Sequence, residues 1–360
     1  MTPAGLAGIL TAFGVESLGA PEPVGGGHIN AAWRITGTRP DLAGRFLLQR
    51  LNPAVFPDAT AVLENCVQVS AHLRNAACAA GWPEARWRVA EPLRTPEGRL
   101  GVPDEAGAWW RLFPWLEGTR AIREAGSAAE VHAVGSAFGR FHALMASYDG
   151  PPLRSPLPGF HDTPARLRRF EAALAAADPD RSRAAAAEVA FALEHQRWAG
   201  ALAGAGLPET IAHNDAKAAN VLLDASSGAG VAVVDLDTVM PGLRLHDVGD
   251  LLRSGVGTVA EDAPATEPVA VDRDRFRVLV AGFTAGLGAA ALTAAERELF
   301  VTAGVVLCYE QGLRFLGDYL EGDRYYRTSR AGQNLDRARV QLRLAAALAA
   351  AQGELELLVR

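Results

Sequence analysis

Residues 213–220 read HNDAKAAN and residues 233–237 read VVDLD, and these two segments decide the predicted fold. Together they have the form HxDxKxxN followed by a second aspartate, Asp235, twenty positions after Asp215. Phosphoryl transfer needs an acceptor hydroxyl held in line and a metal ion that bridges the phosphates. An aspartate and an asparagine, Asn220, five positions apart on a tight loop can face one metal–phosphate cluster, to which the second aspartate returns. The pattern predicts a phosphotransfer site.

Two other residues of the first segment fit this interpretation. Lys217 supplies the positive charge that a transferring phosphoryl group requires, and the sequence contains no lysine before it. His213 adjoins an apolar strand, so we expect it to support the loop by hydrogen bonds rather than to titrate in catalysis. The structural alternative is that Asp215 and Asn220 merely cap turns, as Asx residues often do. That alternative explains each residue singly but not their joint occurrence.

A β-hairpin is predicted between the two segments. The apolar runs VLLD and VAVVD flank residues 225–228, which read ASSG and are typical of a turn. The hairpin explains the spacing of twenty residues between Asp215 and Asp235, because it returns Asp235 toward the loop that carries Asp215.

Length and composition exclude several classes of protein. With 360 residues the chain is long enough for two packed units, and its 49% hydrophobic and 21% charged residues are typical of globular proteins. The net charge of −6 argues against nucleic acid or an anionic membrane as a partner. No segment reaches the roughly 20 apolar residues of a membrane span. We expect a soluble, cytoplasmic protein, and the oligomeric state stays open.

The cysteines show no pattern of disulfides or zinc ligands. Cys66, Cys78 and Cys308 lie far apart and form no CxxC motif, so they are predicted to be buried thiols in a reducing compartment.

The N-terminal part of the chain predicts a small sheet with one helix packed beside it. A short helix over 3–14 precedes strands on both sides of the glycine cluster at 25–27, and a third strand covers 45–51. A helix over 61–80 follows. Two further strands are predicted near 87–89 and 109–113.

Composition changes at residues 114–118, where we place the boundary between a nucleotide-binding lobe, 1–116, and a catalytic and acceptor-binding lobe, 117–360. Alanine and leucine dominate the second lobe and predict helices. These helices are expected over residues 128–147, 164–176, 183–204, 292–306 and 337–351. The predicted fold class is α+β.

Five segments spread over nearly the whole chain resemble one enzyme superfamily. The loop is similar to that of the aminoglycoside phosphotransferase and choline kinase superfamily, whose fold is two-lobed and protein-kinase-like. More specifically, five segments resemble the N-acetylhexosamine 1-kinase subfamily: GGGHIN (25–30), FLLQRLN (46–52), NDAK (214–217), DLDTVMPG (235–242) and GLRFLGDYLEGD (312–323). The resemblance implies ATP- and Mg²⁺-dependent phosphorylation of the anomeric hydroxyl of GlcNAc or GalNAc.

The resemblance also implies roles for individual residues. Asp215 matches the catalytic base, Asn220 and Asp235 match the magnesium ligands, and Glu64 matches the glutamate of the first-lobe helix. The basic partner of that glutamate is less clear, because the superfamily often has a lysine on the third strand.

This sequence offers Gln49 and Arg50 in place of that lysine. Arg50 shares strand parity with Leu48 and Phe46, so we choose Arg50 on the condition that Leu48 faces the nucleotide. An arginine there would contact the phosphates with a planar fork rather than a point charge.

Further residues are candidates for nucleotide and acceptor binding. Glycines let backbone N–H groups approach phosphate oxygens, and apolar side chains near the lobe connection stack on adenine in the superfamily. The nucleotide candidates are Gly25, Gly26, Gly27, Leu112, Phe113 and Trp115. Polar side chains suit the hydroxyls of a sugar. The acceptor candidates are His28, Asn30, Asp237, Glu310, Arg314 and Tyr325. Asp247 and Asp250 are expected to brace the loop.

Two alternatives remain. In the first alternative, the acceptor of the kinase is another hydroxylated molecule, such as an aminoglycoside, choline or homoserine. A cationic acceptor of this kind would require a distinctly acidic pocket. A non-enzymatic alternative is a nucleotide-binding pseudokinase, which predicts loss of the base or of a metal ligand. Asp215, Asn220 and Asp235 are all present.

Overall fold

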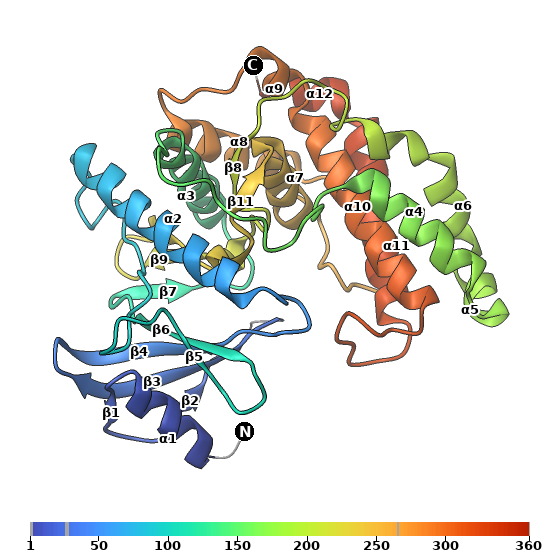
Figure 1. Cartoon of the computed structure of the whole chain (residues 1–360). Coiled ribbons are helices and arrows are strands. Elements are labelled where there is room, and N and C mark those ends of the chain that lie inside the picture. The colour runs from blue at the N-terminus through green and yellow to red at the C-terminus, as the bar shows by residue number, and fades with distance from the viewer. Residues whose placement is uncertain (1–2, 26–28, 265, 360) are drawn as a thin grey trace. The chain divides into compact units, whose positions relative to one another are not determined.

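The computed structural model describes residues 3–25, 29–264 and 266–359 (Figure 1). It divides into two compact units, each built from separate stretches of the chain. Unit 1 comprises Met1–Arg123, Ser147–Pro158 and Val221–Pro241, and unit 2 comprises Glu124–Ala146, Gly159–Asn220 and Gly242–Arg360. The predicted α+β class is confirmed, with antiparallel sheets in unit 1 and mostly helices in unit 2.

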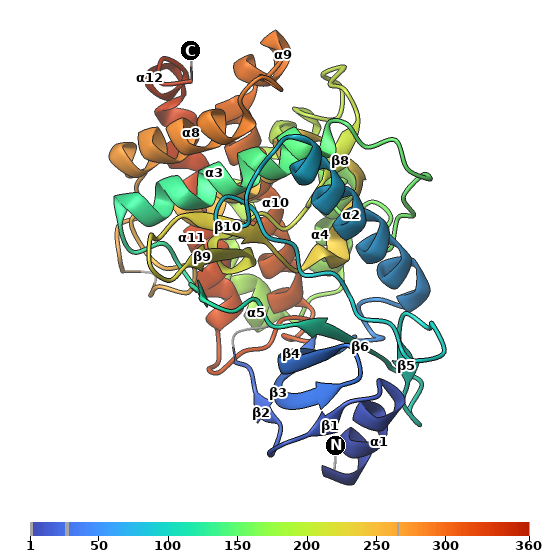
Figure 2. The same ribbon diagram turned by 90° about the vertical axis from the view of Figure 1, so that its left-hand side faces the viewer.

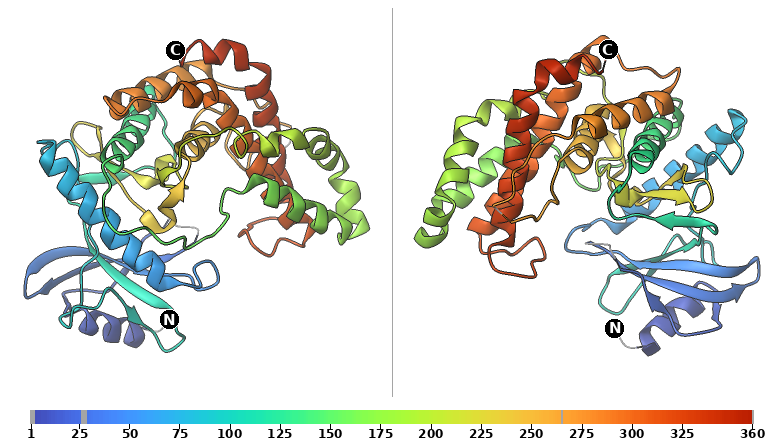
Figure 3. Two further views of the ribbon diagram at one scale, coloured as in Figure 1. Left: turned by 45° about the horizontal axis from the view of Figure 1, so that its top comes forward. Right: turned by 180° about the vertical axis from the view of Figure 1, so that it is seen from behind.

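Unit 1 contains a six-stranded antiparallel sheet in the order β1-β3-β4-β6-β5, with β2 also paired to β3. Its strands are β1 (Glu16–Ser17), β2 (Glu22–Pro23), β3 (Ala31–Arg39), β4 (Leu42–Arg50), β5 (Val102–Pro103) and β6 (Trp109–Pro114). Helix α1 (Pro3–Ala12) lies against one face of this sheet (Figure 3). Phe46, Leu48 and Leu112 face α1 and are completely buried. The predicted N-terminal helix and third strand are confirmed.

Helix α2 (Ala59–Ala79) confirms the predicted first-lobe helix. It begins after Asp58, whose carboxylate accepts a hydrogen bond from the Ala61 amide at 3.0 Å and so satisfies one free N–H group of the first turn. Cys66 on this helix and Cys308 are buried as predicted, but Cys78 is exposed. The prediction for Cys78 was wrong because its side chain lies on the solvent side at the end of α2.

The predicted hairpin is confirmed as β9 (Val221–Asp224) and β10 (Gly230–Val233), which form a second sheet of unit 1 with β7 (Thr119–Ala121). The strand predicted at 87–89 is absent. The Arg88 amide makes one backbone hydrogen bond to Val231 O at 2.6 Å, and no ladder forms there.

Unit 2 is built around helix α10 (Phe300–Leu320), which is buried along almost its whole length. Helices α4 (Thr163–Ala175), α7 (Arg244–Gly255) and α11 (Gln333–Ala350) pack against it. The remaining helices are α3 (Ala128–Met145), α5 (Pro179–Ala184), α6 (Ala186–Glu194), α8 (Arg273–Leu287), α9 (Ala294–Glu298) and α12 (Gln352–Glu356).

The short elements are strand β8 (Thr210–Ala212), strand β11 (Met240–Gly242), and the 3-10 helices Gln196–Gly200, Ala218–Asn220 and Leu236–Thr238. The helical stretches predicted at 128–147, 164–176 and 337–351 are confirmed as α3, α4 and α11. The stretch 183–204 instead contains α6 and a 3-10 helix, and 292–306 is divided between α9 and α10. Helices α7 and α8 were not predicted. No helix in the described part of the chain is long and apolar enough to cross a membrane.

Helices α3 and α8 run side by side at unusually close range (Figure 2). Two glycines on each helix allow this. A Cβ atom at Gly139 would lie 2.1 Å from Phe283 O, and one at Gly286 would lie 2.2 Å from Ser136 O. Backbone therefore meets backbone, and no side chain fits at these positions.

We expect Gly286→Ala to lower the free energy of unfolding by at least about 1–3 kcal/mol, since overpacking forces the backbones apart. Gly8→Ala on α1 is the matched control, because nothing lies within 4 Å of a Cβ there. It should leave stability unchanged or raise it by up to about 1 kcal/mol, because alanine is the better helix former. Urea unfolding of the two variants checks this, and equal stabilities would contradict the close-packing argument.

Candidate active site

The loop that carries Asp215 begins where β8 ends, and α7 holds it in place. The backbone N–H groups of His213 and Asn214 donate to the Asp247 carboxylate at 2.7 and 2.6 Å. His142 Nε2 on α3 lies 2.9 Å from the same carboxylate. Asn214 adopts the left-handed conformation, with φ of 62°, which asparagine tolerates better than most residues. The bracing role predicted for Asp247 is confirmed.

The structure brings Asp215, Lys217 and Asn220 together. Lys217 Nζ lies 3.0 and 2.8 Å from the two carboxylate oxygens of Asp215. Asn220 Nδ2 donates to Asp215 O at 2.8 Å and to Asp215 Oδ2 at 3.0 Å. Burial raises the pKa of the Asp215 carboxyl, but the Lys217 ammonium and the hydrogen bonds outweigh it, so this pKa lies below its usual value. Asp215 is therefore ionised at neutral pH and able to accept a hydrogen bond.

His213 lies behind this loop and is completely buried. Its ring packs edge-on against Phe138 and Phe141, with centroid distances of 5.4 and 5.7 Å. This position agrees with a supporting role for His213, as the sequence predicted.

His161 joins the loop to α10, and the sequence analysis missed it. Its Nδ1 lies 2.9 Å from Glu310 Oε1, and its Nε2 lies 3.0 Å from the Asn214 carbonyl oxygen. Thr163 donates to the other oxygen of Glu310 at 2.6 Å. A carbonyl oxygen only accepts, and the Glu310 carboxylate accepts here too, so both ring nitrogens of His161 donate. His161 is therefore a buried imidazolium ion.

The pKa shifts of this pair agree with the geometry. Burial lowers the pKa of His161, but the charge and hydrogen bond of Glu310 outweigh it, so the pKa is raised above 6.5. Burial raises the pKa of Glu310, but His161 outweighs this effect and lowers it to about 2. A single histidine in a glycine-containing turn gave no signal from which the sequence could predict the pair.

The raised pKa of His161 makes a testable contribution to stability. That contribution is fully present below the unfolded-state pKa of about 6.5 and is lost as the pH rises through the higher folded-state value. We expect the free energy of unfolding of the wild type to fall more steeply above pH 7 than that of His161→Gln. Chemical denaturation across pH 6–10 measures this difference, with His132→Gln, on the exposed side of α3, as control. Parallel curves for the wild type and His161→Gln would contradict an imidazolium.

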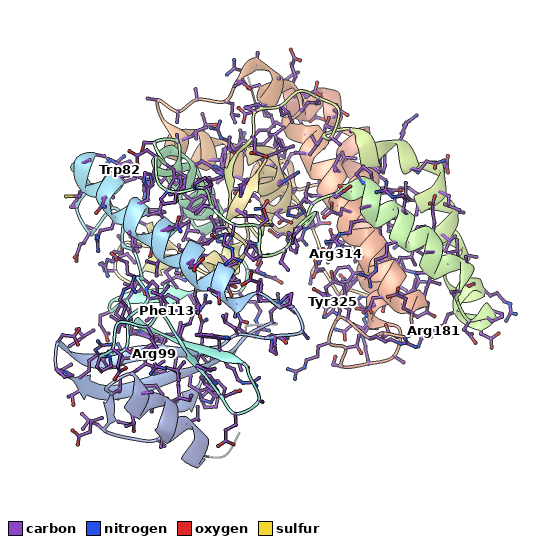
Figure 4. The ribbon with its side chains drawn as sticks, in the orientation of Figure 1. Trp82, Arg99, Phe113, Arg181, Arg314 and Tyr325 are labelled. Carbon is purple, nitrogen blue, oxygen red and sulfur yellow. The ribbon has the colours of Figure 1, made fainter. Side chains whose placement is uncertain are left out.

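Arg314 on α10 and Tyr325, which follows this helix, are both predicted to contact the acceptor and lie near each other (Figure 4). The Arg314 guanidinium lies 5.2 Å from the centroid of the Phe160 ring and 5.7 Å from that of Tyr326. Tyr325 is 52% exposed, and its amide donates to Asp318 Oδ1 at 2.7 Å. Glu310 and Arg314 thus belong to one packed group, and Tyr325 lies at its exposed edge.

In unit 1 the predicted acceptor residues Asn30 and Asp237 also come together, around an arginine that the sequence analysis missed. Arg111 Nη1 lies 2.5 Å from Asp237 Oδ1, and Asn30 Nδ2 donates to Asp237 Oδ2 at 2.7 Å. Gln49 Oε1 accepts from Arg111 Nε and Nη2 at 3.1 and 2.9 Å. The side chains of Arg111 and Asp237 are 1% and 3% exposed. This buried ion pair ties β6 to the segment that follows Asp235.

The predicted pairing of Glu64 with Arg50 is wrong. Arg50 Nε donates to Asp104 at 2.7 Å, and Glu64 pairs with Arg154 at 3.2 Å. The parity argument for Arg50 rested on Leu48 facing the nucleotide, but Leu48 is buried in the core beside α1. Gln49 lies on the opposite face of β4.

The nucleotide candidates have different environments. Leu112 pairs with Leu48 and is buried in the core beside α1, so its predicted contact with adenine is wrong. Phe113 is on the other face of β6, with the Arg111 guanidinium 5.0 Å from its ring centroid. Trp115 is half-buried, and the Arg45 guanidinium lies 5.6 Å from its ring centroid. Gly25 is exposed, whereas Gly26, Gly27 and His28 lie outside the described residues.

The predicted magnesium ligands flank the β9–β10 hairpin. Asn220 directly precedes β9, Asp235 follows β10, and the hairpin register pairs Val221 with Val233. Asn220 Nδ2 is occupied by Asp215, which leaves its Oδ1 as the ligand atom. An amide oxygen and a carboxylate are ligands that Mg²⁺ accepts, usually with phosphate and water completing the shell. Within the described ranges no cluster of three or more His, Cys, Asp or Glu side chains forms an all-protein metal site.

Comparisons with solved structures show the same fold in small-molecule kinases. A microcompartment-associated aminopropanol kinase is 15% identical, with a TM-score of 0.63 and 98% of each chain covered. A choline/ethanolamine kinase family protein from Mesorhizobium loti is 16% identical, with a TM-score of 0.56 and coverage of 99% of this chain and 97% of the other.

An amicoumacin kinase in complex with AMP-PNP, Ca²⁺ and Ami is 13% identical, with a TM-score of 0.51 and coverage of 92% of this chain and 88% of the other. These neighbours have the protein-kinase-like fold that the sequence predicted. Residues 21–278 match the phosphotransferase enzyme family, APH. Because this match covers most of the chain, as well as the loop that joins Asp215, Lys217 and Asn220, the protein belongs to the phosphotransferase enzyme family and is a small-molecule phosphotransferase with a hydroxyl acceptor.

Proposed function

We propose that this phosphotransferase transfers the γ-phosphoryl group of ATP to the anomeric hydroxyl of an N-acetylhexosamine, GlcNAc or GalNAc, to give the sugar 1-phosphate. The five sequence segments that resemble the N-acetylhexosamine 1-kinase subfamily suggest this acceptor. We further propose residues 1–116 as the nucleotide-binding lobe and residues 117–360 as the catalytic and acceptor-binding lobe.

The observation that carries the proposal is that both acidic acceptor candidates are already neutralised. Glu310 is paired with the His161 imidazolium, and Asp237 with the Arg111 guanidinium. A cationic acceptor such as an amino alcohol needs a carboxylate without a counter-charge. A neutral sugar needs hydrogen-bond donors and acceptors instead, and these groups supply them. The charge arrangement therefore favours an N-acetylated sugar over choline or an aminoglycoside.

In the proposed mechanism, Asp215 accepts a hydrogen bond from the acceptor hydroxyl and orients it in line with the γ-phosphorus. Because its pKa is low, Asp215 acts mainly by orientation and takes the proton late, as a loose phosphoryl-transfer transition state allows. The anomeric hydroxyl is more acidic than a primary alcohol, which suits such a weak base. Lys217 is paired with Asp215, and its proposed role is to supply positive charge to the transferring phosphoryl group.

Asn220 and Asp235 are the proposed magnesium ligands. A magnesium ion held by these two residues would supply positive charge to the phosphate groups of ATP. His213 supports the loop from behind. We propose that Gly25, Gly26, Gly27, Phe113 and Trp115 contribute to the nucleotide site, and that His28, Asn30, Arg314 and Tyr325 contribute to the acceptor site.

Asp235→Ala is expected to abolish magnesium-dependent turnover, because the polyphosphate charge is then poorly neutralised. The apparent affinity for magnesium should fall by more than the roughly 10- to 100-fold that outer-sphere changes cost. Titrating magnesium at saturating ATP measures this effect, with the exposed Asp149→Ala as control. An unchanged magnesium response would move the metal site elsewhere.

An acceptor screen tests the proposed substrate. ADP release should be fastest with GlcNAc or GalNAc and slow with glucosamine, choline and aminoglycosides. Phosphorus NMR of the product should show coupling to the anomeric proton, since a 6-phosphate couples to a methylene pair instead. A 6-phosphate, or brisk turnover of an amine acceptor alone, would refute the acceptor assignment and leave the phosphotransferase standing.

A further inference from the structure

Two arginines of unit 2 lie on either side of Phe160. Arg166, on α4, donates from Nη2 to the Phe160 carbonyl oxygen at 2.8 Å. Arg314, on α10, lies over the Phe160 ring and donates to Gln311 Oε1 at 3.1 Å. Both side chains are partly buried, and each guanidinium repels the other. Two helices thus bring like charges to the same residue, one to its backbone carbonyl oxygen and one to its ring.

Neither arginine has an acidic partner. Among the described residues, no carboxylate forms an ion pair with Arg166 or Arg314, and Arg166 Nε is buried without a hydrogen-bond acceptor. Two other arginines with buried guanidinium groups are paired with aspartates, Arg111 with Asp237 and Arg253 with Asp250. A buried charge without a partner costs free energy, so this arrangement calls for an anion.

The nearest acidic group does not provide that anion. Glu310 interacts with both arginines, but its two oxygens are taken by His161 and Thr163. Burial lowers the pKa of Arg314, but the charges of Tyr326 and Glu310 outweigh it, so this pKa is raised and Arg166 alone of the two lacks compensation. Burial, followed by repulsion from Arg314, lowers the pKa of Arg166, which is the effect expected when a counter-anion is missing.

We propose that Arg166 and Arg314 form an oxyanion site, which takes a carboxylate or phosphate group of a small-molecule ligand. Guanidinium groups bind such oxyanions with paired, charge-assisted hydrogen bonds, and Arg166 Nε is the donor left for this purpose. The site adjoins Glu310. With GlcNAc or GalNAc as the acceptor, the ligand group is the phosphate of the product, an assignment that alone rests on the proposed function; an acidic substituent would belong to a different acceptor.

Binding of inorganic phosphate tests the site directly. In isothermal titration calorimetry, Arg166→Gln should bind phosphate about 10- to 100-fold more weakly than the wild type, the worth of one charged hydrogen bond. Arg168→Gln, an exposed position on the same helix, is the matched control and should bind like the wild type. Arg166→Lys keeps the positive charge but loses the planar guanidinium group, so its phosphate affinity should lie between those of Arg166→Gln and the wild type. This variant also tests the site if Arg166→Gln unfolds.

Equal phosphate affinity in Arg166→Gln, Arg166→Lys and Arg168→Gln would overturn the proposal. Acceptor kinetics then separate the two sources of the anion. A lower KM for glucuronate than for glucose, lost in Arg166→Gln, would place the acid on the acceptor. If glucuronate has no advantage but product inhibition by the sugar phosphate weakens in Arg166→Gln, the anion is the product phosphate. If no sugar is phosphorylated while phosphate binding still depends on Arg166, the proposed acceptor fails and the oxyanion site stands.

Discussion

Replacing Asp215 with asparagine is expected to lower kcat by about 10²- to 10⁴-fold, the usual worth of a positioned general base. Asparagine has nearly the same shape, so it keeps the contacts of the loop, but it cannot take the proton of the acceptor hydroxyl. Lys217 loses its carboxylate partner in this variant but keeps its positive charge, so the affinity for ATP should change little. Steady-state kinetics and a fluorescent nucleotide titration measure the two quantities separately.

Asp149→Asn makes the same chemical change at an exposed position and should leave kcat unchanged. Near-wild-type turnover of Asp215→Asn would remove Asp215 from its proposed role. Loss of nucleotide binding together with kcat would instead indicate that the substitution disturbs the loop.

The second large effect is expected at Arg111. Arg111→Met leaves the Asp237 carboxylate buried without its counter-charge, and breaking a buried pair in this way costs about 3–5 kcal/mol. Combining Arg111→Met with Asp237→Leu should recover much of that loss, because two apolar side chains then replace the pair. Denaturant unfolding of the two single variants and the double variant gives the coupling free energy between Arg111 and Asp237 directly.

Arg45→Met on the neighbouring strand removes an exposed ion pair with Glu117 and serves as the control. Its unfolding midpoint should stay close to that of the wild type, because solvent screens such pairs. If Arg111→Met were no more destabilising than Arg45→Met, the pair would contribute nothing to the fold.

The main elements of the fold could be predicted from local signals. The hairpin at β9 and β10 has two apolar runs around a serine–glycine turn, and α2 and α11 are long stretches without glycine or proline. Helices α7 and α8 were missed for opposite reasons. The first is rich in charged residues that are buried only through tertiary pairs such as Asp247 with His142 and Arg244 with Glu296. The second contains glycines that weaken a helix locally but permit close packing with α3.

The catalytic loop was predictable because its residues lie close in sequence, whereas the charge pairs around it were not. His161 and Glu310 are 149 positions apart, and Arg111 and Asp237 come from separate stretches of unit 1. Strand parity correctly put Arg50 on the same face as Leu48, but parity cannot say which face a helix covers. Because α1 covers the face of Leu48, the choice of Arg50 and of Leu112 was wrong.

The glycine contact between α3 and α8 limits how far α8 can move without displacing the loop that carries Asp215. His142 on α3 holds Asp247, and its ring also meets Phe283 on α8, with centroids 6.0 Å apart. No layer of side chains at the glycine positions can absorb a shift of α8, so its displacement passes directly to His142 and to the loop. A misplacement of about 1 Å can cost on the order of 10²-fold in rate. Random mutagenesis should therefore find slow but folded enzymes among α8 variants, although α8 carries no residue of the proposed site.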